Sequence, residues 1–258
     1  MTEWDIWLKK GERVDDVGFG GLFLIQKPAE FCYGIDGVLL ADFAELKKGN
    51  RAVDLGTGTG IIPLILSYKS EGTELWGLEV QEASFERALR TVALNGLTHR
   101  IHLICSDVKE AVAILGAGSF DTVISNPPYN SNKDGLKNVN MAKTIARHEI
   151  TGTLEDFIES ASGLLKDRGD FYLVHRPSRL VDIFILARKY RLEPKTIRFV
   201  SPRFDEKPNI VLIHCVKNAG PELRFLDPLF VYDKNGEYTK EIQNIYERKK
   251  TCSDTGQV

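Results

Sequence analysis

Residues Ser125–Tyr129 read Ser-Asn-Pro-Pro-Tyr and combine groups that could hold a planar amino group. The side-chain oxygen of Asn126 and the carbonyl of Pro127 can each accept one N–H of that group. With both hydrogens held, the nitrogen lone pair is localised and can attack an electrophilic methyl group. The two prolines make the turn rigid, and the Tyr129 ring offers a face for stacking. The segment therefore predicts methyl transfer to an amino or amide nitrogen, with these catalytic residues: Asn126, Pro127, Pro128 and Tyr129.

A glycine-rich segment with the spacing Asp-x-Gly-x-Gly-x-Gly covers residues 54–60. It lies between an expected strand and an expected helix, where glycines allow a tight turn and a close approach of backbone to ligand. The third glycine comes one residue earlier than in the GxGxxG of NAD-binding proteins. Combined with the Asn-Pro-Pro-Tyr motif, this spacing favours S-adenosylmethionine as the cofactor; an ordinary strand-to-helix turn is the alternative. We predict that it is bound by Asp54, Gly56, Thr57, Gly58 and Gly60, next to Asn126.

Two acidic residues follow the next two expected strands. Glu79 ends the second strand, where an acid accepts hydrogen bonds from ribose hydroxyls in dinucleotide-binding folds. Asp107 follows the third strand and could reach the adenine edge of the cofactor. The alternative for Asp107 is the N-cap of the following helix, and the two roles can coexist.

Strands and helices alternate from residue 51 onward. The apolar patterns predict strands at 52–55, 74–79, 101–105, 120–125, 171–174, 196–200 and 210–216. They predict helices at 61–68, 83–95, 108–115, 154–165 and 180–190. The last two strands have no helix between them, so they should pair antiparallel. We therefore predict an α/β, Rossmann-like fold: a seven-stranded, mostly parallel sheet with one antiparallel strand near an edge and helices on both faces.

The remaining segments divide the chain into three parts. Residues 1–50 form an N-terminal extension with a strand at 21–26 and a helix over 36–46, and we expect it to pack on the core. Residues 51–218 form the main domain. Residues 219–258 form a C-terminal extension whose polar end, 251–258, we expect to be disordered. The long polar segment 129–150 directly follows the Asn-Pro-Pro-Tyr strand, as functional loops often do.

Composition excludes several classes of protein. The four cysteines are far apart and show no metal-ligand spacing, so we predict neither a metal site nor a disulfide. No signal peptide and no apolar run of membrane-spanning length are visible, which favours a cytoplasmic protein without a membrane partner. The formal net charge of −2 gives no general case for nucleic-acid binding. The sequence does not distinguish a monomer from a homodimer.

The two motifs resemble those of class I S-adenosylmethionine-dependent methyltransferases that act on amino or amide nitrogens. More narrowly, the chain resembles the bacterial tRNA(Val) adenine-37 N6-methyltransferase family. Further stretches that carry this likeness are 12–16, 24–26, 34–41, 146–149, 202–203 and 208–212. The resemblance implies that the cofactor is held by Asp54, Gly56, Gly58, Glu79 and Asp107, with Tyr33 and Asp36 at its methionine end. It also implies that Asn126, Pro127 and Tyr129 hold the target adenine, and that the partner is RNA, expected to be a tRNA.

An RNA substrate requires local basic surface on this slightly acidic chain. Candidate clusters are Lys133, Lys137, Lys143, Arg147 and His148, then Arg176, Arg179, Arg198 and Arg203, and finally Arg248, Lys249 and Lys250. The alternative is that these charges only solvate the surface.

We expect N6-methylation of an adenine in RNA, at adenosine 37 of a tRNA such as tRNA(Val). The alternatives are a glutamine N5-methyltransferase acting on a protein, an rRNA guanine N2-methyltransferase, or an RNA-binding module that retains the cofactor without transferring its methyl group. A DNA substrate is not expected because no insertion is large enough for a target-recognition domain.

Overall fold

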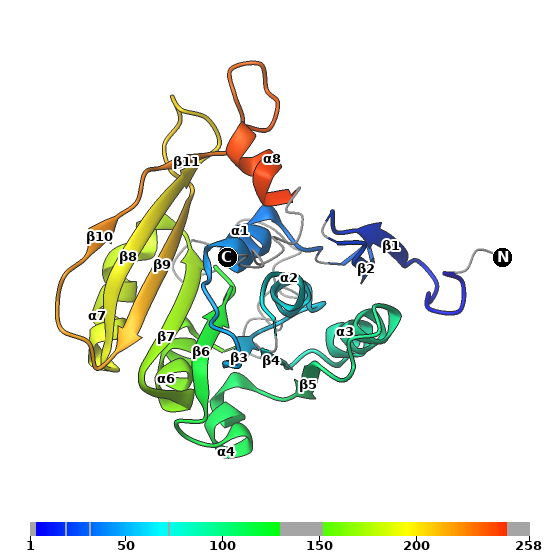
Figure 1. The fold of residues 1–258 in the computed structure, drawn as a ribbon, viewed down its shortest axis with the longest axis horizontal. Helices are drawn as coiled ribbons and strands as arrows, with labels where there is room; N and C mark the ends of the chain where they lie inside the picture. Colours follow the sequence, from blue (N-terminus) through cyan, green and yellow to red (C-terminus); the bar gives the residue numbers. More distant parts are fainter. Residues whose placement is uncertain (1–3, 19, 31, 72, 130–151, 247–258) are drawn as a thin grey trace, which may run out of the picture.

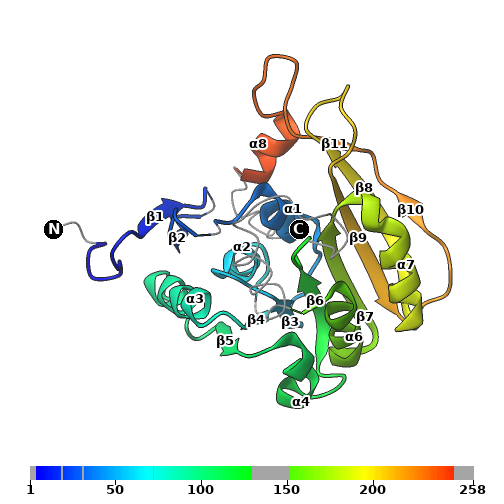
Figure 2. The same ribbon diagram turned by 180° about the vertical axis from the view of Figure 1, so that it is seen from behind.

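A central β-sheet with helices on both faces forms the body of the protein (Figures 1 and 2). The computed structural model describes residues 4–18, 20–30, 32–71, 73–129 and 152–246. Strand order in the sheet is β10-β8-β9-β7-β6-β3-β4-β5, and β11 also pairs with β8. Its strands are β3 (Arg51–Leu55), β4 (Glu74–Glu79), β5 (Ile101–Cys105), β6 (Phe120–Ser125), β7 (Leu165–His175), β8 (Leu192–Ser201), β9 (Ile210–Lys217), β10 (Arg224–Phe225) and β11 (Leu229–Phe230).

The predicted fold class is confirmed. β9 runs antiparallel to both β7 and β8, while the other pairs in the sheet are parallel. The sheet has two more strands than the seven predicted. Both β10 and β11 are two-residue strands beside β8, too short to leave a periodic pattern in the sequence.

Side chains of alternating strand residues point to opposite faces of the sheet and build two apolar clusters. Val53 and Val123 belong to one cluster, and their neighbours Ala52 and Ile124 belong to the other. The first cluster includes residues of α4 (Ala111–Leu115), α6 (Leu154–Leu164) and α7 (Leu180–Lys189). The second includes residues of α1 (Ile35–Phe43), α2 (Ile61–Lys69), α3 (Glu82–Leu94) and α8 (Lys240–Tyr246).

The start of one strand was predicted wrongly. The helix predicted at 154–165 matches α6, which ends at Leu164, but β7 starts at Leu165 without a loop, before the strand predicted at 171–174. Leu165 pairs with Phe120 and Asp170 pairs with Thr122, so the residues between them bulge out of the strand. Arg168 accommodates the bulge with a φ of 61°. The polar stretch therefore marks a β-bulge rather than a loop.

The N-terminal extension forms a two-stranded antiparallel sheet beside α3, made of β1 (Arg13–Asp16) and β2 (Phe23–Gln26). Only β2 was predicted as a strand. The backbone N–H of Ile25 donates to Thr91 Oγ1 over 3.1 Å. The Asn95 side chain bonds both the N–H and the carbonyl of Phe23. Side chains of α3 and of its C-cap residue Asn95 therefore provide hydrogen bonds to the backbone at the outer edge of β2, as another strand would.

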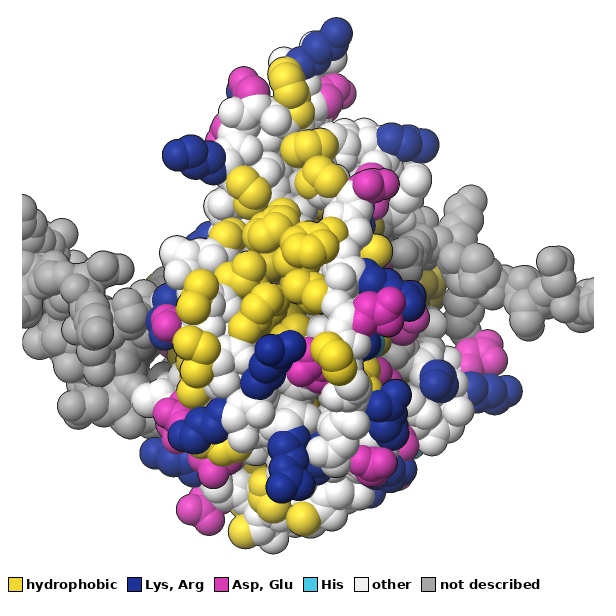
Figure 3. All heavy atoms as spheres, turned by 90° about the vertical axis from the view of Figure 1, so that its left-hand side faces the viewer, with side chains coloured by type: hydrophobic (Ala, Val, Ile, Leu, Met, Phe, Trp, Pro, Cys, Tyr) yellow, Lys and Arg dark blue, Asp and Glu magenta, His cyan; other side chains and the backbone are white. Residues whose placement is uncertain are grey.

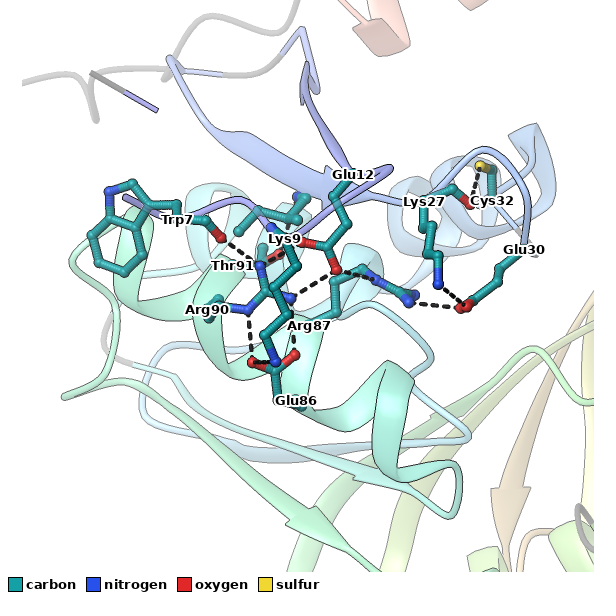
Figure 4. A network of polar contacts seen from close by, with 11 residues as sticks. Trp7, Lys9, Glu12, Lys27, Glu30, Cys32, Glu86, Arg87, Arg90 and Thr91 are labelled. Atoms are coloured by element: carbon teal, nitrogen blue, oxygen red, sulfur yellow. Dashed lines mark hydrogen bonds and ion pairs between the residues drawn. The ribbon is translucent and has the colours of Figure 1, made fainter. Parts of the chain in front are cut away.

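A network of ion pairs, the N-terminal clasp, fixes this extension to α3 (Figure 4). The clasp consists of Glu12, Glu30, Glu86, Arg87 and Arg90. Arg87 bridges Glu12 at 3.4 Å and Glu30 at 2.6 Å, and Arg90 bridges Glu12 at 2.7 Å and Glu86 at 2.8 Å. The side chains of Arg87 and Glu12 are only 3% and 4% exposed. The clasp is thus a structural network with a buried centre at Arg87 and Glu12.

The C-terminal extension returns across the core. Ile242 and Ile245 of α8 are buried in the same cluster as Leu39 of α1, and α8 lies next to α1 in both ribbon views (Figures 1 and 2). The expected disorder of 251–258 and the long segment after Tyr129 lie outside the described residues. Within the described ranges, no helix is both long and apolar enough to cross a membrane.

Apolar side chains gather over the outer edge of the sheet, on the side of β8, β10 and α7 (Figure 3). Those that these elements expose include Val181 and Ile185 of α7 and Phe225 of β10. Such patches are enriched at surfaces that contact another protein. None of these three side chains lines the cavity described below.

Candidate active site

The glycine-rich segment forms a sharp turn between β3 and α2, called here the cofactor turn (residues 56–60). Gly56, Gly58 and Gly60 have φ values of 77°, 58° and 87°, which L-residues with a side chain rarely adopt. The N–H groups of Gly56 and Thr57 both donate to the carbonyl of Leu78, each over 2.9 Å. The glycine spacing therefore serves a left-handed turn that is fastened to β4.

The Glu79 carboxylate holds the same turn from the end of β4. Its two oxygens accept the N–H of Gly58 and the N–H of Gln81, each over 2.8 Å. Burial raises the pKa of this carboxyl, and the backbone donors offset part of the rise. A carboxylate has about four acceptor positions, so Glu79 retains capacity for the hydroxyls of a ligand.

A cavity of about 530 Å³ opens beside the turn, within the usual size range for small-molecule sites. Among the predicted site residues, those in its wall are Tyr33, Asp36, Gly56, Thr57, Gly58, Glu79, Asn126, Pro127, Pro128 and Tyr129. Three predicted residues do not line it: Asp54, Gly60 and Asp107. The chain thus brings both motifs and the N-terminal extension to one cavity.

Asp54 lies beneath the turn at the end of β3. It is 1% exposed, and neither of its carboxylate oxygens has a hydrogen-bond partner among the described residues. Burial raises the pKa of Asp54 to about 7. The nearby Thr57 hydroxyl lowers this pKa, although it does not reach hydrogen-bond geometry, and the Glu79 charge raises it. Thr57 Oγ1 is also buried without a partner among the described residues. Thr57 lines the cavity and Asp54 does not, so a polar ligand in the cavity can complete the Thr57 hydroxyl.

Asp107 is the N-cap of a 3₁₀ turn, Val108–Glu110. Its Oδ1 accepts the N–H of Lys109 over 3.0 Å. Its neighbours Ser106 and Val108 line the cavity. The structure therefore displays the capping role considered above, and a contact of Asp107 with the adenine of the cofactor stays a prediction.

The transfer motif (residues 126–129) follows β6 at the carboxyl edge of the sheet. Ser125 Oγ donates to the carbonyl of Leu55 over 2.9 Å and fastens β6 to β3 just before the motif. Pro127 is buried and Pro128 is exposed. The Asn126 side chain lines the cavity, and we find no hydrogen-bond partner for it within the described ranges. Its acceptor oxygen is therefore available to a ligand.

Tyr129 connects the transfer motif to the N-terminal extension. Its hydroxyl donates to Asp36 Oδ2 of α1 over 2.5 Å. Burial, together with the Asp36 charge and hydrogen bond, raises the pKa of Tyr129, so the hydroxyl stays protonated. The His175 ring lies 5.0 Å from the Tyr129 ring, and the Arg176 guanidinium carbon lies 4.7 Å over it. The ring orientation is thus fixed from several sides.

His175 was not predicted as a site residue, and Arg176 was predicted only as a member of a basic cluster. His175 ends β7, the strand next to β6, and Arg176 follows it, so the rule that ligands bind at the carboxyl edge could have placed both at the site. Burial and the positive charges of Arg179 and Arg176 lower the pKa of His175 to about 4. Its Nδ1 accepts the backbone N–H of Arg176 over 2.8 Å. At neutral pH, this imidazole is therefore uncharged.

The predicted basic clusters give a mixed result. Those at 133–148 and 248–250 lie outside the described residues. Three of the four later arginines have acidic partners: Arg179 pairs with Asp182, Arg198 with Glu241 and Arg203 with Glu206. The fourth, Arg176, lines the cavity. The four arginines therefore do not form one cationic surface.

The described residues include no group of three or more His, Cys, Asp or Glu side chains placed to hold a metal ion. The donor set suits an organic ligand instead: a carboxylate at Glu79, backbone N–H groups of a glycine turn and an amide at Asn126.

Known proteins with similar sequences are methyltransferases. The family model described as "Methyltransferase small domain" matches residues 31–187. A tRNA1(Val) (adenine(37)-N6)-methyltransferase of Porphyromonas gingivalis is 31% identical over 85% of this chain and 89% of its own length. Another from Bacteroides fragilis is 26% identical over 83% of this chain and 90% of its own length.

A solved structure supports the fold. A protein of Agrobacterium tumefaciens, described as a predicted O-methyltransferase, superposes with a TM-score of 0.68 at 24% identity over 82% of this chain and 95% of its own. At this identity the likeness shows the Rossmann-like methyltransferase fold alone.

The match to the family model over more than half of the chain, and the 31% identical relative over most of its length, settle the family. The chain is an S-adenosylmethionine-dependent methyltransferase, and the unpaired Thr57 hydroxyl and the Glu79 carboxylate in the cavity wall fit that cofactor. It belongs to the methyltransferase small domain family and, within it, to the family of the tRNA1(Val) (adenine(37)-N6)-methyltransferases.

Proposed function

We propose that this protein methylates N6 of an adenosine in RNA, and that the target is adenosine 37 of a valine tRNA, as the names of its relatives state for them. The observation that carries this proposal is the Asn126 side chain, which lines the cavity beside the cofactor turn with its amide oxygen available. An exocyclic amino group is a planar donor of two N–H bonds and matches Asn126 and the Pro127 carbonyl.

The cofactor would lie against the cofactor turn. Glu79 would accept hydrogen bonds from its ribose hydroxyls while keeping the backbone bonds that hold the turn. Tyr33 and Asp36, which line the cavity from the N-terminal extension, would border its methionine end. When bound, S-adenosylmethionine supplies a methyl group made electrophilic by the sulfonium.

The residues of the transfer motif act by positioning. Asn126 Oδ1 and the Pro127 carbonyl accept the two N–H groups of the target and turn its lone pair toward the methyl donor. Tyr129, held by Asp36, stacks on the base. Such orientation can supply about 7–11 kcal/mol of a barrier. No strong base is required, because the proton of the methylated amine can leave to solvent.

The N-terminal extension favours RNA over a protein glutamine as the target. This extension forms a small sheet and α1 that pack on the core, and residues between β2 and α1 and at the start of α1, such as Tyr33 and Asp36, line the cavity. The release-factor type of glutamine methyltransferase usually has a helical substrate domain in this part of the sequence. An amide target would use the same two acceptors, so the choice between them needs an experiment.

Transfer of labelled methyl from S-adenosylmethionine tests the proposal. The acceptor is total tRNA from a strain that lacks the protein, followed by nucleoside analysis. We expect label in N6-methyladenosine, and none in a valine tRNA transcript whose adenosine 37 is replaced by guanosine. Label in protein or rRNA, with none in tRNA, would overturn the proposed substrate.

A further inference from the structure

Arg176 differs in its contacts from Arg179, Arg198 and Arg203, the other arginines of its predicted cluster. Its guanidinium lies over the Tyr129 ring, and Nη1 donates to the carbonyl of Asn209 over 3.0 Å. Ion pairs with carboxylates occupy Arg179, Arg198 and Arg203, but we find none for Arg176 in the part of the chain that the structure describes. A guanidinium has five N–H donors, so most of its donor capacity is open.

The position of Arg176 places this cation at the mouth of the active site. Its backbone N–H is tied to His175, and it is the N-cap residue of the 3₁₀ turn Pro177–Arg179. The side chain itself is exposed. The backbone is therefore fixed while the guanidinium can turn about it.

The guanidinium covers a ring face that a target base would need. A base can stack on the covered face of Tyr129 only when the guanidinium moves away. The cation–π contact is worth about 0.5–1 kcal/mol at an exposed site, so it is easily exchanged for a stronger contact. A phosphate offers that contact, because Arg–phosphate pairs are charge-assisted and often bidentate.

We propose that Arg176 binds a phosphate of the nucleotide that carries the target base. Without RNA, the guanidinium rests on Tyr129; with RNA, it leaves the ring to the base and holds the adjacent backbone. This inference rests on the proposed RNA substrate, since a glutamine side chain carries no phosphate.

Two substitutions separate charge from stacking at this position. R176Q keeps a planar group for Tyr129 but loses the charge, whereas R176K keeps the charge but loses the planar fork. The probe is the anticodon stem-loop of a valine tRNA, with equilibrium binding measured at several salt concentrations. We expect R176Q to bind about tenfold more weakly and its log Kd to depend less on log salt, by a slope of about 0.7–0.9. R176K should keep the wild-type slope, and both variants should bind S-adenosylmethionine as the wild type does.

Neutral phosphate analogues identify which phosphate Arg176 contacts. In this experiment, a methylphosphonate replaces each phosphate of the target nucleotide in turn. At one position, it should weaken wild-type binding by the factor seen for R176Q and have no further effect on R176Q, since interacting groups are not additive. The control is R179Q, which removes a nearby arginine paired with Asp182 and outside the cavity wall; its salt slope should not change.

The outcomes distinguish this inference from the proposed function. In one outcome, the wild type binds and methylates the RNA normally while R176Q shows the same dependence of log Kd on log salt as the wild type. That result would overturn the phosphate contact but not the proposed RNA substrate. If R176Q and R176K both lowered turnover without changing the salt dependence of RNA binding, Arg176 would only position the Tyr129 ring, and the phosphate contact would be overturned. If the wild type failed to methylate the stem-loop and every tRNA, the proposed function itself would fall.

Discussion

Glu12 in the N-terminal clasp and Asp54 beneath the cofactor turn are both buried carboxylates, but their surroundings are opposite. Burial alone would raise the pKa of Glu12, yet hydrogen bonds from Arg90, the Lys9 backbone and Arg87 lower it to about 2. Burial raises the pKa of Asp54 to about 7, and no full hydrogen bond compensates. The first carboxylate is fully paired within the protein, and the second is not.

This difference in pairing distinguishes residues that stabilise the fold from residues of the candidate active site. In the clasp, charged side chains satisfy one another, so folding alone completes the network. At the site, the Asp54 carboxylate, the Thr57 hydroxyl, the Asn126 amide and the Arg176 guanidinium all keep unused capacity. Asp54 and Thr57 are buried, and buried polar groups without partners cost free energy. Thr57, Asn126 and Arg176 line the cavity, so we infer that the cofactor and substrate complete these three. Substitutions should therefore affect stability in one region and activity in the other.

Asn126→Ala should have the largest effect, and that effect should fall on catalysis. The change removes an acceptor for the target amino group, and loss of one such positioning or stabilising contact costs about 10²–10³-fold in turnover. The cofactor turn is untouched, so the Kd for S-adenosylmethionine should change less than about threefold. Single-turnover methyl transfer and calorimetric titration would measure the two quantities. Turnover near the wild-type rate would contradict the assignment of the transfer motif.

Arg87→Met should instead reduce stability. Removing one partner of a buried ion pair costs about 3–5 kcal/mol, and we expect the lower end because Glu12 keeps Arg90. Urea unfolding of the cofactor-free protein measures the loss. The matched control is Arg13→Met, which breaks a pair whose arginine side chain is 58% exposed and should cost less than about 1 kcal/mol. Equal losses for the two variants would mean that the clasp is no stronger than a surface pair.

Glu79→Gln tests a residue that belongs to both regions, because it supports the turn and faces the cavity. Gln keeps one acceptor oxygen for the N–H groups of Gly58 and Gln81 but presents an amide donor in place of the other. Hydrogen bonds to a charged group are worth about 1.5–3 kcal/mol, so the Kd for S-adenosylmethionine should rise about 30-fold. Turnover at saturating cofactor should stay within a few-fold of wild type. A loss of turnover with unchanged cofactor affinity would place Glu79 in the chemistry instead.

The sequence predicted what local patterns determine. Apolar patterns and glycine spacing located the core strands and the turn, and the Asn-Pro-Pro-Tyr motif located Asn126, because each depends on a short run of residues. The contacts between distant residues were not predicted. Tyr129 meets Asp36 across 93 positions, and Arg90 meets Glu12 across 78; no local pattern links such pairs. The same reason explains why Arg176 was grouped with arginines that turn out to be paired elsewhere.

Asp54→Asn should give the smallest effect of these substitutions. It should raise the free energy of unfolding, whereas Arg87→Met lowers it. The folded-state pKa of Asp54, about 7, lies above its ordinary value of 3.8. Between pH 3.8 and about pH 7, the folded protein therefore binds more protons than the unfolded chain does. Stability must therefore fall as pH rises through this window, and the full cost is present above pH 7. Asn removes the charge but leaves a buried amide, so we expect a gain of roughly 2 kcal/mol at pH 8 in the cofactor-free protein and almost none at pH 4.

Thermal unfolding at several pH values, with and without saturating S-adenosylmethionine, measures this change. Asp54 does not line the cavity, so it can act on the cofactor only through the turn above it. If it does, S-adenosylmethionine should stabilise the wild type more than the Asn variant. A variant that is less stable than the wild type at pH 8 without cofactor would show that the carboxylate has a partner in the folded protein. In that case, Asp54 and Glu12 would both be structural, and the contrast between the two regions would not hold at this position.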